Sequence, residues 1–435
     1  MNVCGRLFPR AVVVALTSTS LFSGCLLLPH STGHTYGHHA FIDYWPEEEH
    51  GTGLRLAVKD NIDMKGLVTT AGSEYLAENS PPATHDAPCL AIARQRGVRI
   101  VGKTNLSEFA VAPSGFNEYY GTPKSPLSHI HRLLPGGSSC GSAVSVALGM
   151  ADVSFGTDTA GSVRVPAACC GIVGLKTTHG LVPLQGVVPV EPKHLDTVGP
   201  LAKNIDGAVQ GMDLLENGFT GLYAAARAAK PDAASIRIGR LKLKGTDPQI
   251  DQAIDAALTK AGFQVVPLDD DFRQKWDQAK KDGNTMAAAG AWLSEGPYLA
   301  KTGVSARTKT AILAGRLVYP LGYRKALSRR EAWQHTLHEI FKKVDFIAVP
   351  TLQGAPPGIP PNLKIGLAEA LMLDYQNTVP VNYAGNPAVA VPVPVHHERV
   401  KLTSLELIGP PKSEAGLLNA GRFVEEAVEP HRRLE

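Results

Sequence analysis

Residues 135–183, PGGSSCGSAVSVALGMADVSFGTDTAGSVRVPAACCGIVGLKTTHGLVP, are the most informative stretch of this 435-residue chain. Nine glycines fall between Gly136 and Gly180, and glycine lets backbone N–H groups come close to a bound substrate. The run Thr159-Ala160-Gly161-Ser162 can aim several amides at one oxygen and ends in a hydroxyl. Acyl transfer needs both a nucleophile and donors for a developing oxyanion. The stretch therefore predicts an acyl-transfer site.

A serine nucleophile needs a base, and no histidine occurs between His131 and His179. A buried lysine can take that role when desolvation lowers its pKa. Lys59 is the candidate, because it closes the stretch 54–59, LRLAVK, whose alternating apolar residues predict a strand.

Outside this stretch, strands alternate with helices along the chain. Apolar segments predict strands at residues 54–59, 98–101, 236–241, 263–268, 345–349 and 388–395. Helical spacing predicts helices at residues 87–96, 139–149 and 247–261, with mostly helical sequence at 274–318 and 325–343. No linker divides the body. We therefore expect the α/β fold class in a single domain.

Residues 97–104, GVRIVGKT, match the phosphate-binding pattern G-x-x-x-x-G-K-T. That pattern requires a strand before the first glycine and a loop between the two glycines. Here the residues before Gly97 have helical spacing, and VRIV, with three β-branched residues, predicts a strand. We therefore do not expect a nucleoside triphosphatase.

The composition argues against several other classes of protein. The 43 Lys and Arg residues nearly balance the 40 Asp and Glu residues, and a net charge of +3 is too small to indicate nucleic-acid binding. Six cysteines do not make a disulfide scaffold in a chain of this length, and the absence of a C-x-x-C pair argues against structural zinc. Cys140, Cys169 and Cys170 are predicted to be small buried residues.

The ordered motifs of the body resemble the amidase signature family. They are LAVKDNID, GKTNLSEF, PGGSSxGSA, GTDTAGSVRVPA, CGIVGLK, LDTVGPLA, DFIAVPT and NYAGNPAVAVPV, between about residues 40 and 427. The resemblance implies one amidase-signature domain at residues 40–435, with a mixed β-sheet core surrounded by α-helices. The sequence departs from the family at Ala160, where many members have glycine, and in its short segment before Lys59, where N-terminal helices are usual.

The same resemblance implies a Ser–Ser–Lys catalytic triad that needs no metal or cofactor. Ser162 would be the nucleophile, Ser138 the bridging serine after a cis Gly137–Ser138 bond, and Lys59 the base. The backbone amides that would form the oxyanion hole are those of Thr159, Ala160, Gly161 and Ser162. The residues that would brace this loop are Asp158 and Arg164. Such an enzyme hydrolyses a carboxylic amide through a serine acyl-enzyme.

Residues 1–24 resemble a bacterial lipoprotein signal peptide. Arg6 and Arg10 precede an apolar run at residues 11–22, and Ser23-Gly24-Cys25 follows. This pattern predicts cleavage before Cys25, lipidation of that cysteine and a tether at residues 25–39. A plain secretory signal and an uncleaved anchor are the alternatives. The tether histidines, which could bind a metal but more simply belong to a solvated linker, are His30, His34, His38 and His39.

These motifs together predict an exported amide hydrolase, held by its lipid on the periplasmic face of a bacterial membrane. A soluble periplasmic or secreted protein is the alternative location. The expected partners are a small-molecule amide and the membrane. Two other functions stay open, the glutaminase subunit of a tRNA-dependent amidotransferase and a catalytically silent envelope binding protein. The aromatic residues that could line an acyl pocket or pack in the core are Trp292, Tyr298, Tyr319, Tyr323 and Trp333.

Overall fold

The computed structural model describes residues 33–45, 53–128, 130–360 and 365–432, so the predicted leader and Cys25 lie outside the described residues. The strands are β1 Phe41–Tyr44, β2 Arg55–Lys59, β3 Arg99–Thr104, β4 Val153–Asp158, β5 Val173–Lys176, β6 Thr197–Ala202, β7 Arg237–Arg240, β8 Gln264–Pro267, β9 Phe346–Pro350, β10 Ala388–Pro394 and β11 Leu402–Ile408. They form one 11-stranded sheet in the order β1-β3-β2-β4-β6-β5-β10-β11-β9-β7-β8. The sheet is mixed, with parallel pairs β2–β3, β2–β4, β7–β8 and β7–β9.

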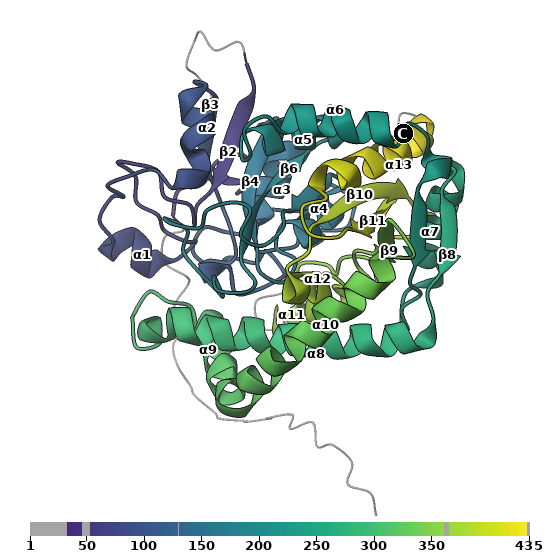
Figure 1. Cartoon of the computed structure of the whole chain (residues 1–435). Coiled ribbons are helices and arrows are strands. Elements are labelled where there is room, and N and C mark those ends of the chain that lie inside the picture. Colours follow the sequence, from purple (N-terminus) through teal and green to yellow (C-terminus); the bar gives the residue numbers. More distant parts are fainter. Residues whose placement is uncertain (1–32, 46–52, 129, 361–364, 433–435) are drawn as a thin grey trace, which may run out of the picture.

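Helices surround this sheet (Figure 1). They are α1 Glu74–Asn79, α2 Ala91–Gln95, α3 Cys140–Ala147, α4 Arg164–Cys170, α5 Ile205–Asp213, α6 Phe219–Ala229, α7 Pro248–Ala261, α8 Asp270–Glu295, α9 Ala306–Val318, α10 Arg324–Phe341, α11 Ile365–Tyr375, α12 Val379–Ala384 and α13 Glu414–Arg432. Helices α5, α6, α7 and α13 pack on one face of the sheet. Helices α3, α4, α8, α10 and α12 pack on the other face. The expected single α/β domain is confirmed.

All six predicted strands are present, as β2, β3, β7, β8, β9 and β10. In β2, Leu56 and Val58 face one apolar cluster while Ala57 faces another, as alternation along a strand requires. Strand β3 runs on to Thr104, beyond its predicted end, and includes Gly102. A Cβ at Gly102 would lie 2.2 Å from the Asp43 carbonyl oxygen of the neighbouring strand. The second glycine of GVRIVGKT is therefore a packing residue within a strand, which confirms that this segment is not a phosphate-binding loop.

Two predicted helical segments are interrupted. Residues 87–96 contain a single 3₁₀ turn at Pro88–Leu90, and only α2 is an α-helix. Residues 274–318 contain the end of α8 and all of α9, separated by a connection. Helix α8 ends at Glu295, next to a short turn that contains Pro297, a residue without a backbone N–H to continue the helical hydrogen bonding. Helix α9 begins after Ser305, whose side chain accepts a hydrogen bond from the Thr308 N–H.

Small residues let α3 lie close against its neighbours. A Cβ at Gly141 would lie 2.2 Å from the Ala40 carbonyl oxygen, and a Cβ at Gly156 of β4 would lie 2.8 Å from Ser139 Oγ. Distances this short leave room only for glycine at the two positions. This close packing holds the loop before α3, which contains Ser138, near the end of β4.

The parallel pairing of β2 and β4 determines where the candidate site forms. Val58 lies opposite Phe155 in the register, so the carboxyl ends of the two strands meet at one edge. Lys59 is the last residue of β2, and Asp158 is the last residue of β4. Ser162 follows in the loop between β4 and α4.

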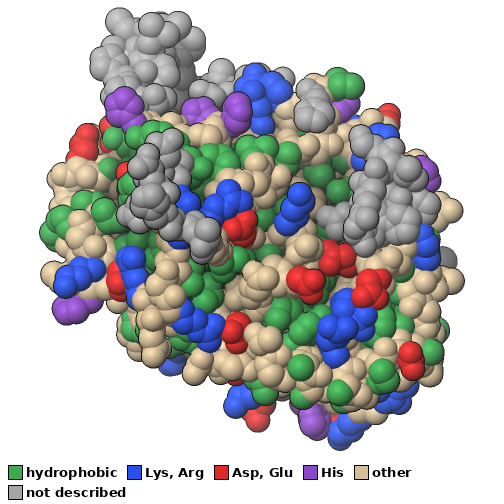
Figure 2. Space-filling view, turned by 90° about the horizontal axis from the view of Figure 1, so that it is seen from above, with side chains coloured by type: hydrophobic (Ala, Val, Ile, Leu, Met, Phe, Trp, Pro, Cys, Tyr) green, Lys and Arg blue, Asp and Glu red, His purple; other side chains and the backbone are tan. Residues whose placement is uncertain are grey.

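The surface agrees with the balanced charge of the chain. Acidic and basic side chains are mixed across the face in Figure 2, without a continuous patch of one sign. Within the described ranges, no helix is both long and apolar enough to cross a membrane. The last residues of the predicted tether contact the domain, since the Gly33 N–H donates to the Tyr119 carbonyl oxygen at 3.1 Å and His39 Nδ1 lies 3.1 Å from the Tyr120 carbonyl oxygen.

Candidate active site

Lys59 and Ser138 form a direct pair at the end of β2. Lys59 Nζ donates to Ser138 Oγ at 2.7 Å and to Thr157 Oγ1 at 2.7 Å. Asn61 Nδ2 also donates to Thr157 Oγ1, at 3.1 Å. Lys59 and Ser138 are completely buried. The structure thus brings together two of the three predicted triad residues, separated by 79 positions in the chain.

The Lys59 ammonium lies in surroundings that disfavour its charge. Burial lowers the pKa of Lys59 to about 7, although the nearby carboxylates of Asp158 and Asp196 act in the opposite direction. Its two hydrogen-bond partners are neutral hydroxyls, so no ion pair offsets the loss of hydration. A substantial fraction of this amine is therefore neutral at physiological pH and can accept a proton.

Ser162 lies beside the Ser138 loop and is the accessible serine. The Ser139 N–H donates to the Ser162 carbonyl oxygen at 3.3 Å, which joins the two serine loops. Ser162 is partly exposed, and its hydroxyl has no hydrogen-bond partner among the described residues. The Gly137–Ser138 peptide bond is cis, as the family resemblance implied. The two serine loops are thus joined through their backbones, with Ser162 partly exposed and Ser138 buried.

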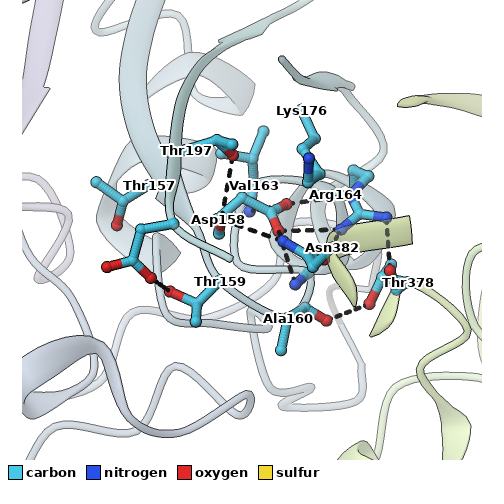
Figure 3. A network of polar contacts seen from close by, with 12 residues as sticks. Thr157, Asp158, Thr159, Ala160, Val163, Arg164, Lys176, Thr197, Thr378 and Asn382 are labelled. Carbon is cyan, nitrogen blue, oxygen red and sulfur yellow. Dashed lines mark hydrogen bonds and ion pairs between the residues drawn. The ribbon is translucent and has the colours of Figure 1, made fainter. Parts of the chain in front are cut away.

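The loop that carries Ser162 is braced by an ion pair (Figure 3). Arg164 Nε and Nη2 donate to the two carboxylate oxygens of Asp158 at 3.1 and 2.9 Å. Arg164 also donates to Glu406 Oε1 and Asn382 Oδ1, each at 2.5 Å. Burial alone would raise the pKa of Asp158, but the Arg164 guanidinium holds this pKa well below its ordinary value. The predicted bracing residues therefore form a buried, charged pair under the loop.

Asp158 also engages part of the predicted oxyanion hole. The Gly161 N–H donates to Asp158 Oδ1 at 2.8 Å, and the Val163 N–H donates to Asp158 Oδ2 at 3.1 Å. The Gly161 amide is therefore already paired in this structure. The predicted amides that have no backbone or side-chain acceptor within the described residues are those of Thr159, Ala160 and Ser162.

Residues that the sequence did not single out hold the loop from outside. Thr378 Oγ1 donates to the Ala160 carbonyl oxygen at 2.5 Å. A Cβ at Gly161, whose φ is +136°, would lie 2.1 Å from Thr378 Oγ1, so this position requires glycine on two grounds. Thr159 Oγ1 donates to Asp196 Oδ1 at 2.7 Å on the other side of the loop. Asp196 and Asn382 do lie within motifs of the family resemblance, which is the signal that could have identified them.

Ser139 shows why a local pattern can mislead. Residues 137–141, GSSCG, fit the G-x-S-x-G pattern of many serine hydrolases, with Ser139 in the nucleophile position. Ser139 is completely buried, and its hydroxyl donates to the Thr157 carbonyl oxygen at 3.3 Å. It therefore serves here as a packing residue that connects α3 to β4.

The nearby cysteines are buried, as predicted. Cys140, Cys169 and Cys170 are each at most 3% exposed. Burial raises the pKa of Cys140 to about 12, so its thiol is neutral at physiological pH. In the part of the chain that the structure describes, no group of three or more His, Cys, Asp or Glu side chains could hold a metal ion.

The five aromatic candidates for an acyl pocket fall into different environments. Trp333 packs in the core, where its indole N–H donates to a backbone carbonyl oxygen at 2.9 Å. Tyr298 lines a cavity. The Tyr323 hydroxyl donates to a carboxylate at 2.7 Å. Trp292 is half-buried against an arginine, and Tyr319 is exposed.

Comparison with known proteins shows to which family the chain belongs. Residues 48–418 match the Amidase family, and the chain belongs to it. The protein is therefore an enzyme of the amidase class.

Two relatives align with most of the chain. The glutamyl-tRNA(Gln) amidotransferase of Halobacterium salinarum has a subunit that is 31% identical over 422 residues, which cover 86% of this chain and 95% of the relative. The 2-amino-5-chloromuconic acid deaminase of Comamonas testosteroni is 35% identical over 400 residues, covering 86% and 82%. The structure of 6-aminohexanoate cyclic dimer hydrolase complexed with substrate shares the fold, with a TM-score of 0.76, 22% identity and 89% of each chain covered.

Proposed function

We propose that this protein hydrolyses a carboxylic amide through a serine acyl-enzyme, with Ser162 as nucleophile, Ser138 as proton relay and Lys59 as base. The observation that carries the proposal is the buried hydrogen bond of 2.7 Å between Lys59 Nζ and Ser138 Oγ. It links a lysine of lowered pKa to a hydroxyl, and a hydroxyl can both give and receive a proton. Family membership supports the reaction class.

In the proposed reaction, neutral Lys59 takes the proton of Ser138 as Ser138 takes the proton of Ser162. Ser162 Oγ bonds to the amide carbon, and the carbonyl oxygen becomes an oxyanion. When the C–N bond breaks, the proton returns through Ser138 to the leaving nitrogen. Water then attacks the acyl-enzyme with the same relay as base, which releases the carboxylate and restores the Ser162 hydroxyl.

The proposed oxyanion donors are the amides that the loop leaves free. The amides of Thr159, Ala160 and Ser162 are available, whereas the Gly161 amide supports the loop through Asp158. Donors of this kind act strongly because the loop is already rigid before substrate arrives. The ion pair of Asp158 with Arg164 supplies that rigidity.

The proposal is tested with Ser162→Ala, Ser138→Ala and Lys59→Met, assayed on a panel of amides with the leaderless protein. Each variant should lose at least about a thousandfold in kcat/KM, because members of one triad act as a unit. Ser139→Ala is the matched control, since its hydroxyl contacts a backbone oxygen and not Lys59. A fluorophosphonate should label Ser162, as mapped by peptide mass spectrometry. Hydrolysis that survives Ser162→Ala in a folded protein would overturn the mechanism.

The amidotransferase relatives favour a second candidate function, the glutaminase subunit of a tRNA-dependent amidotransferase. The relative from Halobacterium salinarum aligns over 95% of its own length, so no large part of it lacks a counterpart here. The predicted leader argues against this function, because charged tRNA lies in the cytoplasm. Glutamine hydrolysis that depends on co-purifying subunits would favour the amidotransferase, and hydrolysis of other amides by the isolated chain would favour the free amidase.

We further propose that the protein is exported and anchored by a lipid on Cys25, on the periplasmic face of a bacterial membrane. The support is the leader sequence, with its basic start, apolar run and Ser-Gly-Cys end. Cys25→Ala should move the protein from the membrane fraction to the soluble fraction. Unchanged membrane retention of that variant would contradict the lipid anchor.

A further inference from the structure

A cavity lined by residues 188 and 189 and by the end of α8 has acidic character. Its volume is about 440 Å³, within the range of small-molecule pockets. Asp63 and Glu295 supply its carboxylates, and Leu76, Pro189 and Tyr298 supply apolar surface. The described lining includes no Lys, Arg or His side chain. This pocket therefore combines two carboxyl groups with a wall suited to hydrocarbon.

Glu295 is the unusual residue of the pocket. It is 1% exposed, Oε2 is buried without a partner, and the Glu295 side chain makes no hydrogen bond within the described residues. Burial, with smaller contributions from Asp196 and Glu108, raises the pKa of Glu295 to about 8. A buried carboxyl without a partner is unfavourable for folding, and an incoming cation would satisfy it.

The other carboxylates around Glu295 already have donors. Asp63 Oδ1 accepts from Thr69 Oγ1 at 2.6 Å, and Glu108 Oε2 accepts from the Ser305 N–H at 3.1 Å. Asp196 accepts from several backbone and side-chain donors, as described for the loop. Glu295 therefore stands apart in this acidic region as a buried carboxyl without a donor, in the wall of a cavity.

The wall of the pocket is connected to the catalytic loop by hydrogen bonds. Ser294 Oγ, next to Glu295, donates to the Val190 carbonyl oxygen at 3.0 Å. The Val190 N–H donates to Asp196 Oδ2 at 2.9 Å, and Asp196 holds Thr159 of the loop. On another side, the Val188 N–H donates to the carbonyl oxygen of Asn61, the residue that shares Thr157 with Lys59.

We propose that this pocket is a subsite for an ammonium group carried by the amide substrate, with Glu295 as its counterion. The inference rests on the proposed amidase function and adds a substrate class, amides with a positively charged amine at the end of a short hydrocarbon chain. The apolar wall packs against the hydrocarbon, and the ammonium donates to the unpartnered carboxyl of Glu295. A charge-assisted hydrogen bond in a pocket of this kind selects the cation over its neutral analogue.

The test compares 5-aminopentanamide with hexanamide, in which a methyl group replaces the ammonium. Both are titrated into the Ser162→Ala protein, where the proposed mechanism allows no turnover. The cationic amide should bind at least about tenfold more tightly, the factor expected for a hydrogen bond to a charged group. When Glu295→Gln is added to the Ser162→Ala protein, the ratio of the two dissociation constants should fall to near one. The change should not disturb folding, because Gln matches the neutral carboxyl in size, and a thermal melt checks this.

Glu331→Gln is the matched control, because it makes the same substitution at an exposed position on α10 and should leave the ratio unchanged. Equal affinity for both amides in the Ser162→Ala protein would overturn the subsite, as would a preference that survives Glu295→Gln. Failure of the proposed function has a different signature, a wild-type protein that hydrolyses neither amide while the binding preference and its dependence on Glu295 persist.

Discussion

Two buried lysines of this molecule look alike by position and differ in chemistry. Lys59 ends β2 and Lys176 ends β5, and neither side chain is exposed. Burial lowers the pKa of each to about 7, and in the case of Lys176 the nearby Arg164 adds to the effect. Lys59 Nζ donates to two hydroxyls, whereas Lys176 Nζ donates to the carbonyl oxygens of Thr177 and Asn386 at 2.9 and 2.8 Å.

This difference shows that a lowered pKa does not by itself identify a base. A hydroxyl can release its proton to a neutral amine, but a carbonyl oxygen has no proton to release. Lys59 can therefore pass protons to and from its surroundings, while Lys176 can only join two backbone segments. The two lysines therefore differ in their hydrogen-bond partners, although they have the same burial and the same lowered pKa.

The largest difference between the two lysines is expected when each amine is removed in turn. Lys59→Met should lower kcat/KM by at least about a thousandfold, because the relay loses its base. Lys176→Met should change kcat/KM by less than about tenfold, provided that the protein folds. Steady-state kinetics on a hydrolysed amide, with a thermal melt for each variant, measure both effects.

If Lys176→Met does not fold, Lys176→Gln keeps a donor for the two carbonyl oxygens and serves in its place. Comparable losses of activity in folded Lys59 and Lys176 variants would show that the partner atoms do not distinguish these lysines.

The pH dependence sharpens the comparison further. The base must be neutral, and the neutral fraction of Lys59 rises with pH through its pKa of about 7. The kcat/KM should therefore fall about tenfold per pH unit below pH 7 and level off above it. The same decrease in kcat/KM below pH 7 should persist in the Lys176 variant. If this decrease disappeared in the Lys176 variant, the group that titrates would be Lys176 and not Lys59.

A smaller effect is expected from the second hydroxyl on Lys59. Thr157→Val removes an acceptor that favours the charged amine, so the pKa of Lys59 should fall further and the acid limb should move to lower pH. The lysine also loses a positioning contact, and kcat should drop by about tenfold. A pH–rate profile of the variant measures both changes, and a limb displaced to higher pH would contradict this role for Thr157.

The smallest effect is expected from the thiol beside the site. Cys140 is buried with a pKa of about 12, so no thiolate is available for nucleophilic attack. Cys140→Ala should keep kcat/KM within about threefold of the wild type, measured with the same amide. A large loss in a folded variant would give the thiol a part in the reaction.

The sequence was sufficient for elements whose apolar residues are continuous, alternate strictly or recur at helical spacing. Strands β2 and β10 and helix α7 were predicted close to their bounds for this reason. Strands β5, VGLK, and β6, TVGPLA, were missed because they contain glycine or proline, which local reasoning assigns to turns. They form only because neighbouring strands supply their hydrogen bonds.

The residues of the candidate site were also predicted only in part. Lys59, Ser138 and Ser162 were predicted through motifs, and the structure places Lys59 against Ser138. The role of Thr157 was missed, because its contact with Lys59 spans 98 positions and depends on the register of β2 with β4. Glu295 was also missed, since an isolated glutamate near a helix end is usually a solvated residue and only its surroundings make it distinctive.

The two carboxylate partners of Arg164 have a consequence for how the protein is made. One of its carboxylate partners, Asp158, is six positions away, but the other, Glu406, is synthesised 242 residues later. Until that segment emerges, the guanidinium under the serine loop lacks half of its counter-charge. A growing chain can therefore carry all three proposed reactive residues long before it can hold the loop in shape. Hydrolysis should be the last property that the nascent protein acquires, when nearly the whole chain has been translated.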